Sequence, residues 1–401
     1  MSGVRRCGRV ACVVLSVSVV AACTGTPGTD GASAAFVVSA EPVWTALTGL
    51  SAGRMPDLRG ESLVVYGPGE DTDDNRAVTV LDVATGQPRW SADSQDSTES
   101  GRARQEKVAD VGDGEWVVLA PYECGTTPGC APGNGLAALD GNDGRTRWRT
   151  PLDPQLPVRY VAVGGDVAVS LLSTSDDTLA GSRAVATDVS DGTVRWESAG
   201  VWPVLVVGDT VLAIEADRVV PLDPTVEQAA TVVALDARTG ARRWDLADRY
   251  PRSNLQLALG DVAVIGTADE DGGNQRSRII DAGTGQELAD FGEPMRCLGD
   301  QENLVVCGTE EGRDLTLFDV ARRESSILRG AGPRQGEGVL SPVRGYLFRG
   351  EDVIDRSGTV VSDQPLGLVV AMSDRYLVSF LDRSGGAGDD VLAGYRIEKK
   401  E

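Results

Sequence analysis

The chain has 401 residues, of which 60 are acidic and 38 basic, and it has no histidine, so its formal net charge at pH 7 is −22. The lack of histidine excludes Ser–His–Asp and Cys–His catalysis, imidazole bases and histidine-ligated metals. The acidic balance makes nucleic acid a poor partner, because phosphate contacts need clustered lysine and arginine. The length predicts two or three domains, unless an internal repeat builds one large domain.

The first residues have the features of an export signal. Three arginines within residues 1–9 precede the uncharged residues 10–22, a stretch too short to span a bilayer and typical of a signal-peptide core. The stretch ends in Val-Ala-Ala followed by Cys23, which resembles the bacterial lipobox. This resemblance implies lipidation of Cys23 and removal of residues 1–22. An ordinary secretory signal with a chance cysteine is the alternative interpretation.

Residues 23–35 form the next predicted unit. After Cys23 the sequence reads TGTPGTDGASAA, which is too poor in large apolar residues to pack. We expect a flexible tether with a reach of roughly 20 Å. The remaining residues, 36–401, would then be a domain tethered to the membrane outside the cytoplasm.

A repeated pattern organises residues 36–401. Its first copy has an apolar run ending at Asp82, then Gly86 and Trp90. Three further copies keep the spacing of four residues from Asp to Gly and eight from Asp to Trp: Asp140, Gly144, Trp148; Asp188, Gly192, Trp196; Asp236, Gly240, Trp244. Weaker copies follow at Asp281 with Gly285 and Ala289, at Asp319 with Ile327 in the tryptophan place, and at Asp355 with Gly358.

The pattern predicts a tight corner between two strands. The aspartate carboxylate accepts hydrogen bonds from turn N–H groups, and glycine supplies the residue with positive φ. The tryptophan then lies on the next strand and packs between successive sheets. We therefore interpret all three residues as structural, and we expect the arginine before each tryptophan to be solvated or paired with aspartate.

Each corner is preceded by a second turn of the Gly-Asp type, at Gly165, Gly208, Gly260 and Gly299. Each unit therefore has four antiparallel strands, which is the architecture of a propeller blade. The spacing favours an all-β, eight-bladed β-propeller over a seven-bladed one. We expect residues 391–397, a third strand without a successor, to pair with the N-terminal segment around Trp44 and so close the ring.

Four cysteines remain after Cys7 and Cys12 in the signal and the lipidated Cys23 are set aside. Cys124 and Cys130 bracket the turn sequence GTTPG, and Cys297 and Cys307 flank a hairpin, as the sequence shows. We predict two local disulfides, which suit an oxidising compartment. A reactive thiol or a metal pair is the alternative, although no spacing matches a zinc site.

The repeat A-x-D-x-x-x-G-x-x-x-W resembles that of the quinoprotein-type (PQQ-like) β-propellers. That family contains pyrroloquinoline-quinone dehydrogenases and also a non-enzymatic lipoprotein, the B subunit of the outer-membrane β-barrel assembly machine. In its alcohol dehydrogenases, the quinone lies over a disulfide between adjacent cysteines and is held by calcium. This sequence has no adjacent cysteines. We therefore assign no catalytic, cofactor-binding or metal-binding residues.

The predicted function is a non-catalytic binding or scaffold module, monomeric and lipid-anchored, for an envelope protein or surface ligand. The alternative is a quinoprotein-like dehydrogenase using pyrroloquinoline quinone and calcium; carbohydrate recognition through Trp116 and Trp202 is a weaker one. The acidic loops 71–75 and 269–274 lack the EF-hand spacing and are interpreted as solvated. Partner binding is expected on the variable loops 67–76, 124–134, 173–182, 215–228 and 267–277.

Overall fold

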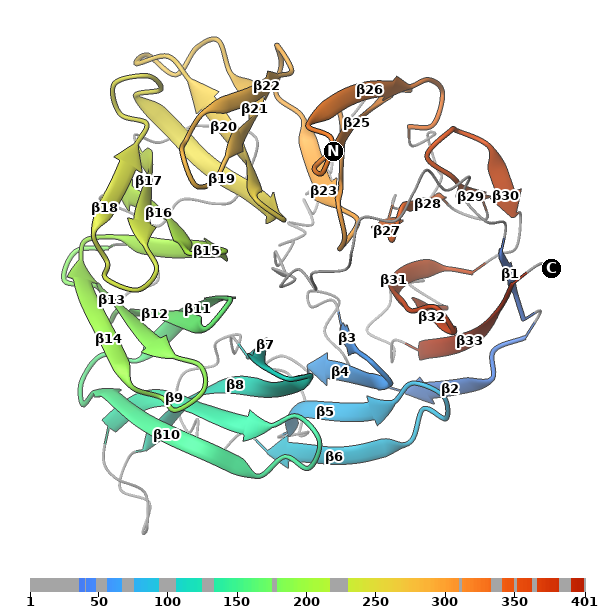
Figure 1. Ribbon diagram of the computed structural model, residues 1–401, viewed down its shortest axis with the longest axis horizontal. Coiled ribbons are helices and arrows are strands. Elements are labelled where there is room, and N and C mark those ends of the chain that lie inside the picture. Colours follow the sequence, from blue (N-terminus) through green and yellow to red (C-terminus); the bar gives the residue numbers. More distant parts are fainter. Residues whose placement is uncertain are drawn as a thin grey trace, which may run out of the picture.

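The chain folds into a ring of eight four-stranded antiparallel sheets, as Figure 1 shows for the computed structural model. This is the predicted eight-bladed β-propeller, and the seven-bladed alternative is wrong. In each blade one strand lies nearest the ring axis and the fourth forms the outer edge. The structure describes residues 36–39, 41–47, 56–66, 76–93, 106–124, 133–174, 179–216, 230–309, 312–332, 341–349, 352–362, 366–381 and 391–399.

The blades are numbered here in chain order, and each runs from its innermost to its outermost strand. Blade 1 comprises β3 (Asp57–Arg59), β4 (Ser62–Tyr66), β5 (Arg76–Asp82) and β6 (Pro88–Asp93). Blade 2 comprises β7 (Lys107–Gly112), β8 (Glu115–Cys124), β9 (Gly133–Asp140) and β10 (Thr146–Asp153). Blade 3 comprises β11 (Val158–Gly164), β12 (Val167–Leu172), β13 (Arg183–Asp188) and β14 (Val194–Ala199). Blade 4 comprises β15 (Trp202–Val207), β16 (Thr210–Ala216), β17 (Ala230–Asp236) and β18 (Arg242–Asp245).

Most strands become shorter after blade 5. Blade 5 comprises β19 (Arg252–Leu259), β20 (Val262–Ala268), β21 (Arg276–Asp281) and β22 (Glu287–Asp290). Blade 6 comprises β23 (Arg296–Gly299), β24 (Leu304–Gly308), β25 (Leu315–Asp319) and β26 (Glu324–Leu328). Blade 7 comprises β27 (Ser341–Val343), β28 (Tyr346–Arg349), β29 (Asp352–Ile354) and β30 (Val360–Ser362).

Blade 8 is built from both ends of the chain. It comprises β31 (Leu368–Met372), β32 (Tyr376–Phe380) and β33 (Val391–Lys399), and its outer position is filled by β1 (Phe36–Val38) and β2 (Trp44–Leu47). Trp44 pairs with Gly394, and Val38 pairs with Ile397. The predicted closure of the ring by N- and C-terminal strands is therefore confirmed, and no sheet is left without its fourth strand.

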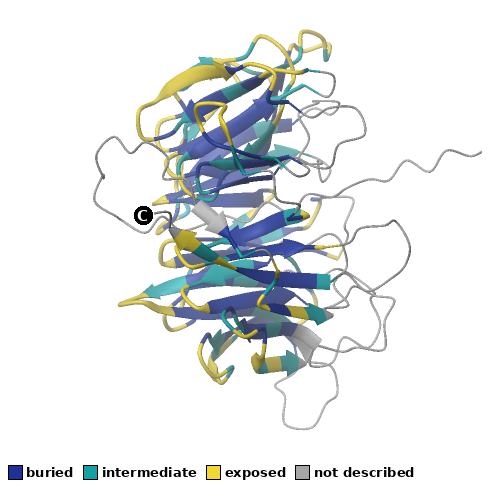
Figure 2. Cartoon of the chain, turned by 90° about the vertical axis from the view of Figure 1, so that its right-hand side faces the viewer, coloured by how far each residue is buried: buried dark blue, intermediate teal, exposed yellow. Residues whose placement is uncertain are grey.

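The core lies between the blades rather than within any one of them. Strands β12, β15 and β20 are buried along their whole length. Figure 2 shows the same trend on the side it presents, where the middle parts of the strands are buried and the exposed residues gather at turns and outer edges. Each apolar cluster joins neighbouring blades; for example, Leu119 and Leu136 of blade 2 pack with Val161 of blade 3. Since a single sheet cannot bury both faces alone, each blade depends on its neighbours for stability.

A tryptophan of one blade docks on the corner of the next. The Trp196 indole N–H donates a hydrogen bond of 2.9 Å to the Ala237 carbonyl, and its ring lies against Gly240. Four more tryptophans make the same bond to the residue after the next blade's aspartate, at Trp44–Val83, Trp90–Gly141, Trp148–Val189 and Trp244–Ala282. Their rings lie on Gly86, Gly144, Gly192 and Gly285.

Two separate constraints require glycine at the corner position, namely the backbone conformation and the space left by the indole ring. Gly240 has φ of +70°, a conformation that other residues adopt at a cost. A Cβ atom there would also lie 2.7 Å from Cδ2 of Trp196. The backbone therefore approaches the indole ring more closely than any side chain would allow.

The expectation that Ile327 takes the tryptophan place in blade 6 is wrong. Ile327 is 66% exposed, and the neighbouring Leu328 instead lies against Gly358 of blade 7. In blades 1 to 5 a register shift precedes the corner in the pairing of the two outer strands, whereas β25 and β26 pair without one. Losing the shift moves every following side chain to the opposite face of the strand.

The fourth Gly-Asp turn also differs from its expected form. Gly165, Gly208 and Gly260 have φ between +56° and +61° and make tight turns. Gly299 instead ends β23, and the longer connection to β24 uses Gln301 at φ 70° as its left-handed residue. The carboxylate of Asp300 folds back to accept the N–H groups of Glu302, Asn303 and Leu304, an arrangement that the shared dipeptide did not reveal.

Two glycine substitutions separate the strain of positive φ from the contact with the indole. Gly208→Ala, with φ +56° and no atom within 4 Å of the added Cβ, should lower the free energy of unfolding by about 1–2 kcal/mol. Gly240→Ala should lower it by roughly 2–5 kcal/mol, because the Trp196 ring must also move. Urea unfolding followed by circular dichroism measures both, and equal losses would contradict the docking contact.

Candidate functional site

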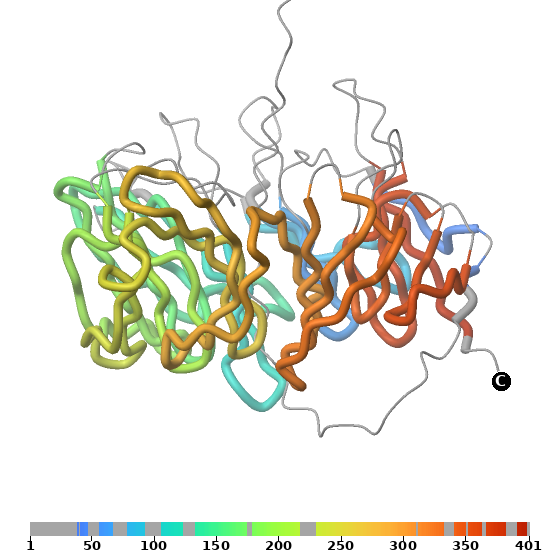
Figure 3. The backbone as a smooth tube through the Cα atoms, turned by 90° about the horizontal axis from the view of Figure 1, so that it is seen from above, coloured from blue at the N-terminus to red at the C-terminus, as the bar shows by residue number. Residues whose placement is uncertain are grey.

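The meander of each blade places its turns on two opposite faces of the ring, seen edge-on in Figure 3. We call the face with the first-to-second strand turns and the Asp-x-x-x-Gly corners the turn face. The loops between second and third strands and the connections between blades lie on the other, the loop face. The sequence patterns concern the turn face almost entirely.

Arginines on the turn face join the two turns of their own blade. Arg243, which precedes the docked tryptophan, donates to Asp236 of the corner at 2.6 Å and to Asp209 of the first turn at 2.7 Å. The equivalent arginines of blades 1 to 3 pair with the corner aspartates, as Arg89–Asp82, Arg147–Asp140 and Arg195–Asp188. These arginines are paired with aspartate, which is one of the two arrangements predicted from the sequence.

The ion pairs hold the corner carboxylates in their charged form. The Arg243 guanidinium, helped by the Thr239 hydroxyl, lowers the pKa of Asp236 to about 2. Arg89 likewise lowers the pKa of Asp82, and Arg195 lowers that of Asp166. These charges therefore satisfy each other within the corner, which is consistent with the structural interpretation of the repeat aspartates.

In blade 5 the equivalent arginine comes from the next blade. Leu288 stands in the arginine place of blade 5, and Arg323 of blade 6 donates instead to Asp281 at 2.8 Å and to Asp261 at 2.7 Å. Arg323 occupies the place of the corner glycine and has φ 57°. Blade 5 has Ala289 in the tryptophan place, so no indole ring excludes a side chain there. Sequence reasoning missed this contact, although the loss of both tryptophan and glycine was its signal.

A second inter-blade arrangement surrounds Asp300, whose side chain is fully buried. Its Oδ2 accepts the Gly345 N–H of blade 7 at 2.8 Å and lies 3.4 Å from Arg356 of the same blade. Arg356 also lies 3.6 Å from Asp319 at the corner of blade 6. Burial raises the pKa of Asp300, while the N–H groups and Arg356 oppose that shift.

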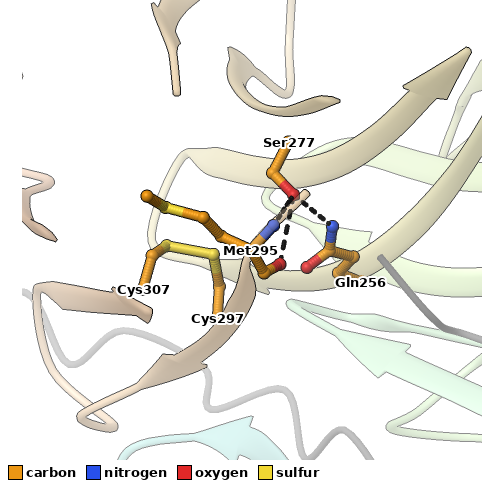
Figure 4. Close-up of a disulfide and its surroundings, with 5 residues drawn as sticks. All are labelled: Gln256, Ser277, Met295, Cys297 and Cys307. Atoms are coloured by element: carbon orange, nitrogen blue, oxygen red, sulfur yellow. Dashed lines mark hydrogen bonds between the residues drawn. A yellow bond between two sulfur atoms is a disulfide. The ribbon is translucent and has the colours of Figure 1, made fainter. Parts of the chain in front are cut away.

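Cys297 and Cys307 form a disulfide between the paired strands β23 and β24, with a Cα–Cα distance of 4.1 Å (Figure 4). Beside it, the Ser277 hydroxyl accepts hydrogen bonds from Gln256 and from the Met295 N–H. The disulfide therefore lies at the contact between blades 5 and 6. The predicted pairing of Cys124 with Cys130 is not tested, because Cys130 lies outside the described residues, as does Cys23.

The described residues do not fit a calcium-held quinone. Nowhere in them do three cysteine, aspartate or glutamate side chains gather as a metal site, and the bonded cysteines are 10 residues apart rather than adjacent. In the acidic loop at 269–274 the Gly273 N–H donates to Asp271 and the Gly272 N–H donates to the Asp269 carbonyl, so the loop is folded by its own hydrogen bonds while its acidic side chains face solvent. Loop 71–75 lies outside the described residues.

Eight blades form a closed ring, and docked tryptophans join five of the neighbouring pairs. This arrangement defines the protein as a repeat β-propeller of the quinoprotein type. The family described as outer membrane protein assembly factor BamB matches residues 29–246 and, in a second alignment, residues 74–326. The chain belongs to this family.

Solved structures agree with the fold. BamB from Moraxella catarrhalis is 15% identical, with a TM-score of 0.50 over 90% of this chain and 100% of that one. Quinohemoprotein alcohol dehydrogenase from Comamonas testosteroni is 14% identical, with a TM-score of 0.53 over 88% of this chain and 76% of that one. At such identities the likeness concerns the fold alone. No curated protein matches the sequence.

The corner carboxylates give the ring a defined sensitivity to acid. In the unfolded chain Asp236 should titrate near 3.8, and in the folded chain near 2. The stabilisation from its ion pair is therefore complete above pH 3.8 and is lost as the pH falls towards 2. We expect the free energy of unfolding of the natural protein to exceed that of Asp236→Asn at neutral pH, and the difference to shrink over this window.

Denaturant unfolding of both proteins at a series of pH values measures that difference. Carboxyl NMR of Asp236 supplies an independent check. A difference that stays constant down to the lowest pH, or an Asp236 carboxyl that titrates at its ordinary value, would contradict the role of Arg243.

Proposed function

We propose that this protein is a lipid-anchored, extracytoplasmic propeller that acts as a non-catalytic binding or scaffold module for an envelope protein. The observation that carries the proposal is the match to the outer membrane protein assembly factor family over most of the propeller. Within the described ranges no helix is long and apolar enough to cross a membrane. Attachment through Cys23 would supply the membrane contact that this proposal needs.

The distribution of charge supports a loop-face binding site. On the turn face, arginine and aspartate neutralise each other within and between blades. The described loop 267–277 on the loop face carries Asp269, Glu270 and Asp271, all exposed. A partner that presents basic side chains would suit this loop, and the rigid ring would hold it in a fixed position.

Photocrosslinking in intact cells tests this proposal. A photoreactive amino acid at Asp271, on the loop face, should trap a defined envelope protein that mass spectrometry identifies. The matched control places it at Asp191, which is likewise an exposed acidic residue but lies in a corner on the turn face. Crosslinks to the same proteins at equal yield from both positions, or none from Asp271, would contradict loop-face binding.

The quinone dehydrogenase alternative has its own test. The purified protein is incubated with pyrroloquinoline quinone and calcium and assayed for dye reduction with alcohols and sugars. Our proposal predicts no substrate-dependent reduction. Turnover above that of the quinone alone would replace the scaffold function with the enzymatic one.

The lipid anchor is tested by substitution of its cysteine. Cys23→Ala should prevent incorporation of a fatty-acid analogue and should release the protein from membranes, while the propeller keeps its unfolding midpoint because residues 36–399 are unchanged. Metabolic labelling and membrane fractionation give the two readouts. Labelling and membrane retention equal to those of the natural protein would show that Cys23 is not the anchor.

A further inference from the structure

The eight interfaces between blades are held in two different ways. Five of them, from blade 8 to blade 1 and onwards to blade 5, contain a docked tryptophan, namely Trp44, Trp90, Trp148, Trp196 and Trp244. The three that follow, between blades 5 and 6, 6 and 7, and 7 and 8, contain none. We call these three consecutive interfaces the ionic sector, because arginine–carboxylate pairs cross each of them on the turn face.

The interface between blades 5 and 6 shows most directly how ion pairs replace a docked tryptophan. Ala289 pairs with Ile279, just as Trp244 pairs with Ala234 in blade 4, so alanine occupies the docking position. With no ring to accommodate, the corner of blade 6 carries Arg323, which binds Asp261 and Asp281 of blade 5. One inter-blade contact has thus replaced another at the same position.

The next two interfaces continue this arrangement. Arg356 and Arg344 of blade 7 reach back to blade 6, where Arg344 lies 2.7 Å from Glu302. Arg344 also reaches forward to Asp374 of blade 8 at 3.0 Å. Docking cannot occur between blades 7 and 8, because the third and fourth strands of blade 8 come from opposite ends of the chain and no corner joins them.

Ion pairs and docked rings respond differently to salt. The side chain of Arg323 is 43% exposed and that of Asp374 is 78% exposed, so dissolved ions screen the pairs that these two residues make. The pair of Arg356 with the buried Asp300 is screened less. A ring buried on glycine gains its stability from packing and from one hydrogen bond, which salt screens little. Ion pairs also cross some docked interfaces, such as Arg375–Glu61 between blades 8 and 1, but there the tryptophan remains when they are screened.

We propose that the ionic sector is a salt-sensitive seam, at which the ring opens before any tryptophan-docked interface does. Apolar clusters also cross the sector, for example Leu317 and Leu328 of blade 6 with Leu347 of blade 7, so the seam loosens locally while the fold persists. The sector would let the ring open locally, whereas each of the other five interfaces is held by a docked tryptophan. It stands independently of the proposed partner.

Hydrogen exchange followed by mass spectrometry tests the seam on the intact protein. Raising NaCl from about 20 mM to about 1 M shortens the screening length to about 3 Å. Exchange of β24, β25 and β28 amides should then accelerate by roughly three- to tenfold, while that of β12 and β13 in blade 3 changes little. Acceleration that is uniform over all blades, or greatest in blade 3, would overturn the proposal.

Variants at the interface between blades 5 and 6 give a matched comparison. Arg323→Gln keeps a side chain at the same φ and removes both ion pairs, so β25 should exchange faster at low salt and respond less to added salt. Arg145→Gln, which removes a pair with Asp143 inside one corner of blade 2, should leave β25 unchanged. An Arg323→Gln protein that exchanges like the natural one would contradict the proposal.

A rescue variant tests whether faster exchange in Arg323→Gln comes from the loss of the ion pairs or from misfolding. The double substitution Ala289→Trp with Arg323→Gly installs the docking pair found in the other corners, with the Val320 carbonyl in the place of the Ala237 acceptor. Exchange of β25 at low salt should return to the natural rate and lose its salt dependence. A natural degree of salt dependence in this variant would show that the ion pairs do not control the seam.

Discussion

The contact between an indole ring and the backbone of the next blade is the interaction on which this structure depends. Each sheet has two apolar faces and cannot bury both without neighbours, so the blades are stable only as a ring. At five of the eight interfaces the tryptophan fixes the angle and distance of that packing, because its N–H reaches one carbonyl while its ring covers one glycine. The same contact at Trp44 joins the N-terminal strand to blade 1 and so holds the closed ring together.

Electrostatics is organised around those corners. The chain has a large excess of acid, yet the corner aspartates of blades 1 to 6 are paired with arginines from their own blade or from the next one. Where the tryptophan is missing, between blades 5 and 6, the arginine instead forms ion pairs across the interface. Many charged groups of the turn face are thus used in contacts within the ring, and the proposed function places partner recognition on the loop face.

Much of the fold could be predicted because its determinants are local in sequence. The spacing of Asp188, Gly192 and Trp196 reports a corner and a ring position within nine residues, and four such copies suffice to predict a propeller. Closure was also predictable, since a lone strand with Trp44 and an unpaired final strand need each other. The contact of Leu328 with the next blade could not be predicted, because a one-residue register shift decides which face of the strand a side chain lies on, and β25 and β26 pair without that shift. The partner of Arg323 lies 42 residues away, where spacing gives no signal.

A double-mutant cycle on Trp196 and Gly240 tests this account most directly. If the ring and the glycine act as one contact, Gly240→Ala should cost roughly 2–5 kcal/mol beside Trp196 but only about 1–2 kcal/mol in a Trp196→Ala background, where φ strain alone remains. Unfolding free energies of the four proteins supply this coupling. The same cost in both backgrounds would contradict the claim that tryptophan docking on glycine sets the geometry of the ring.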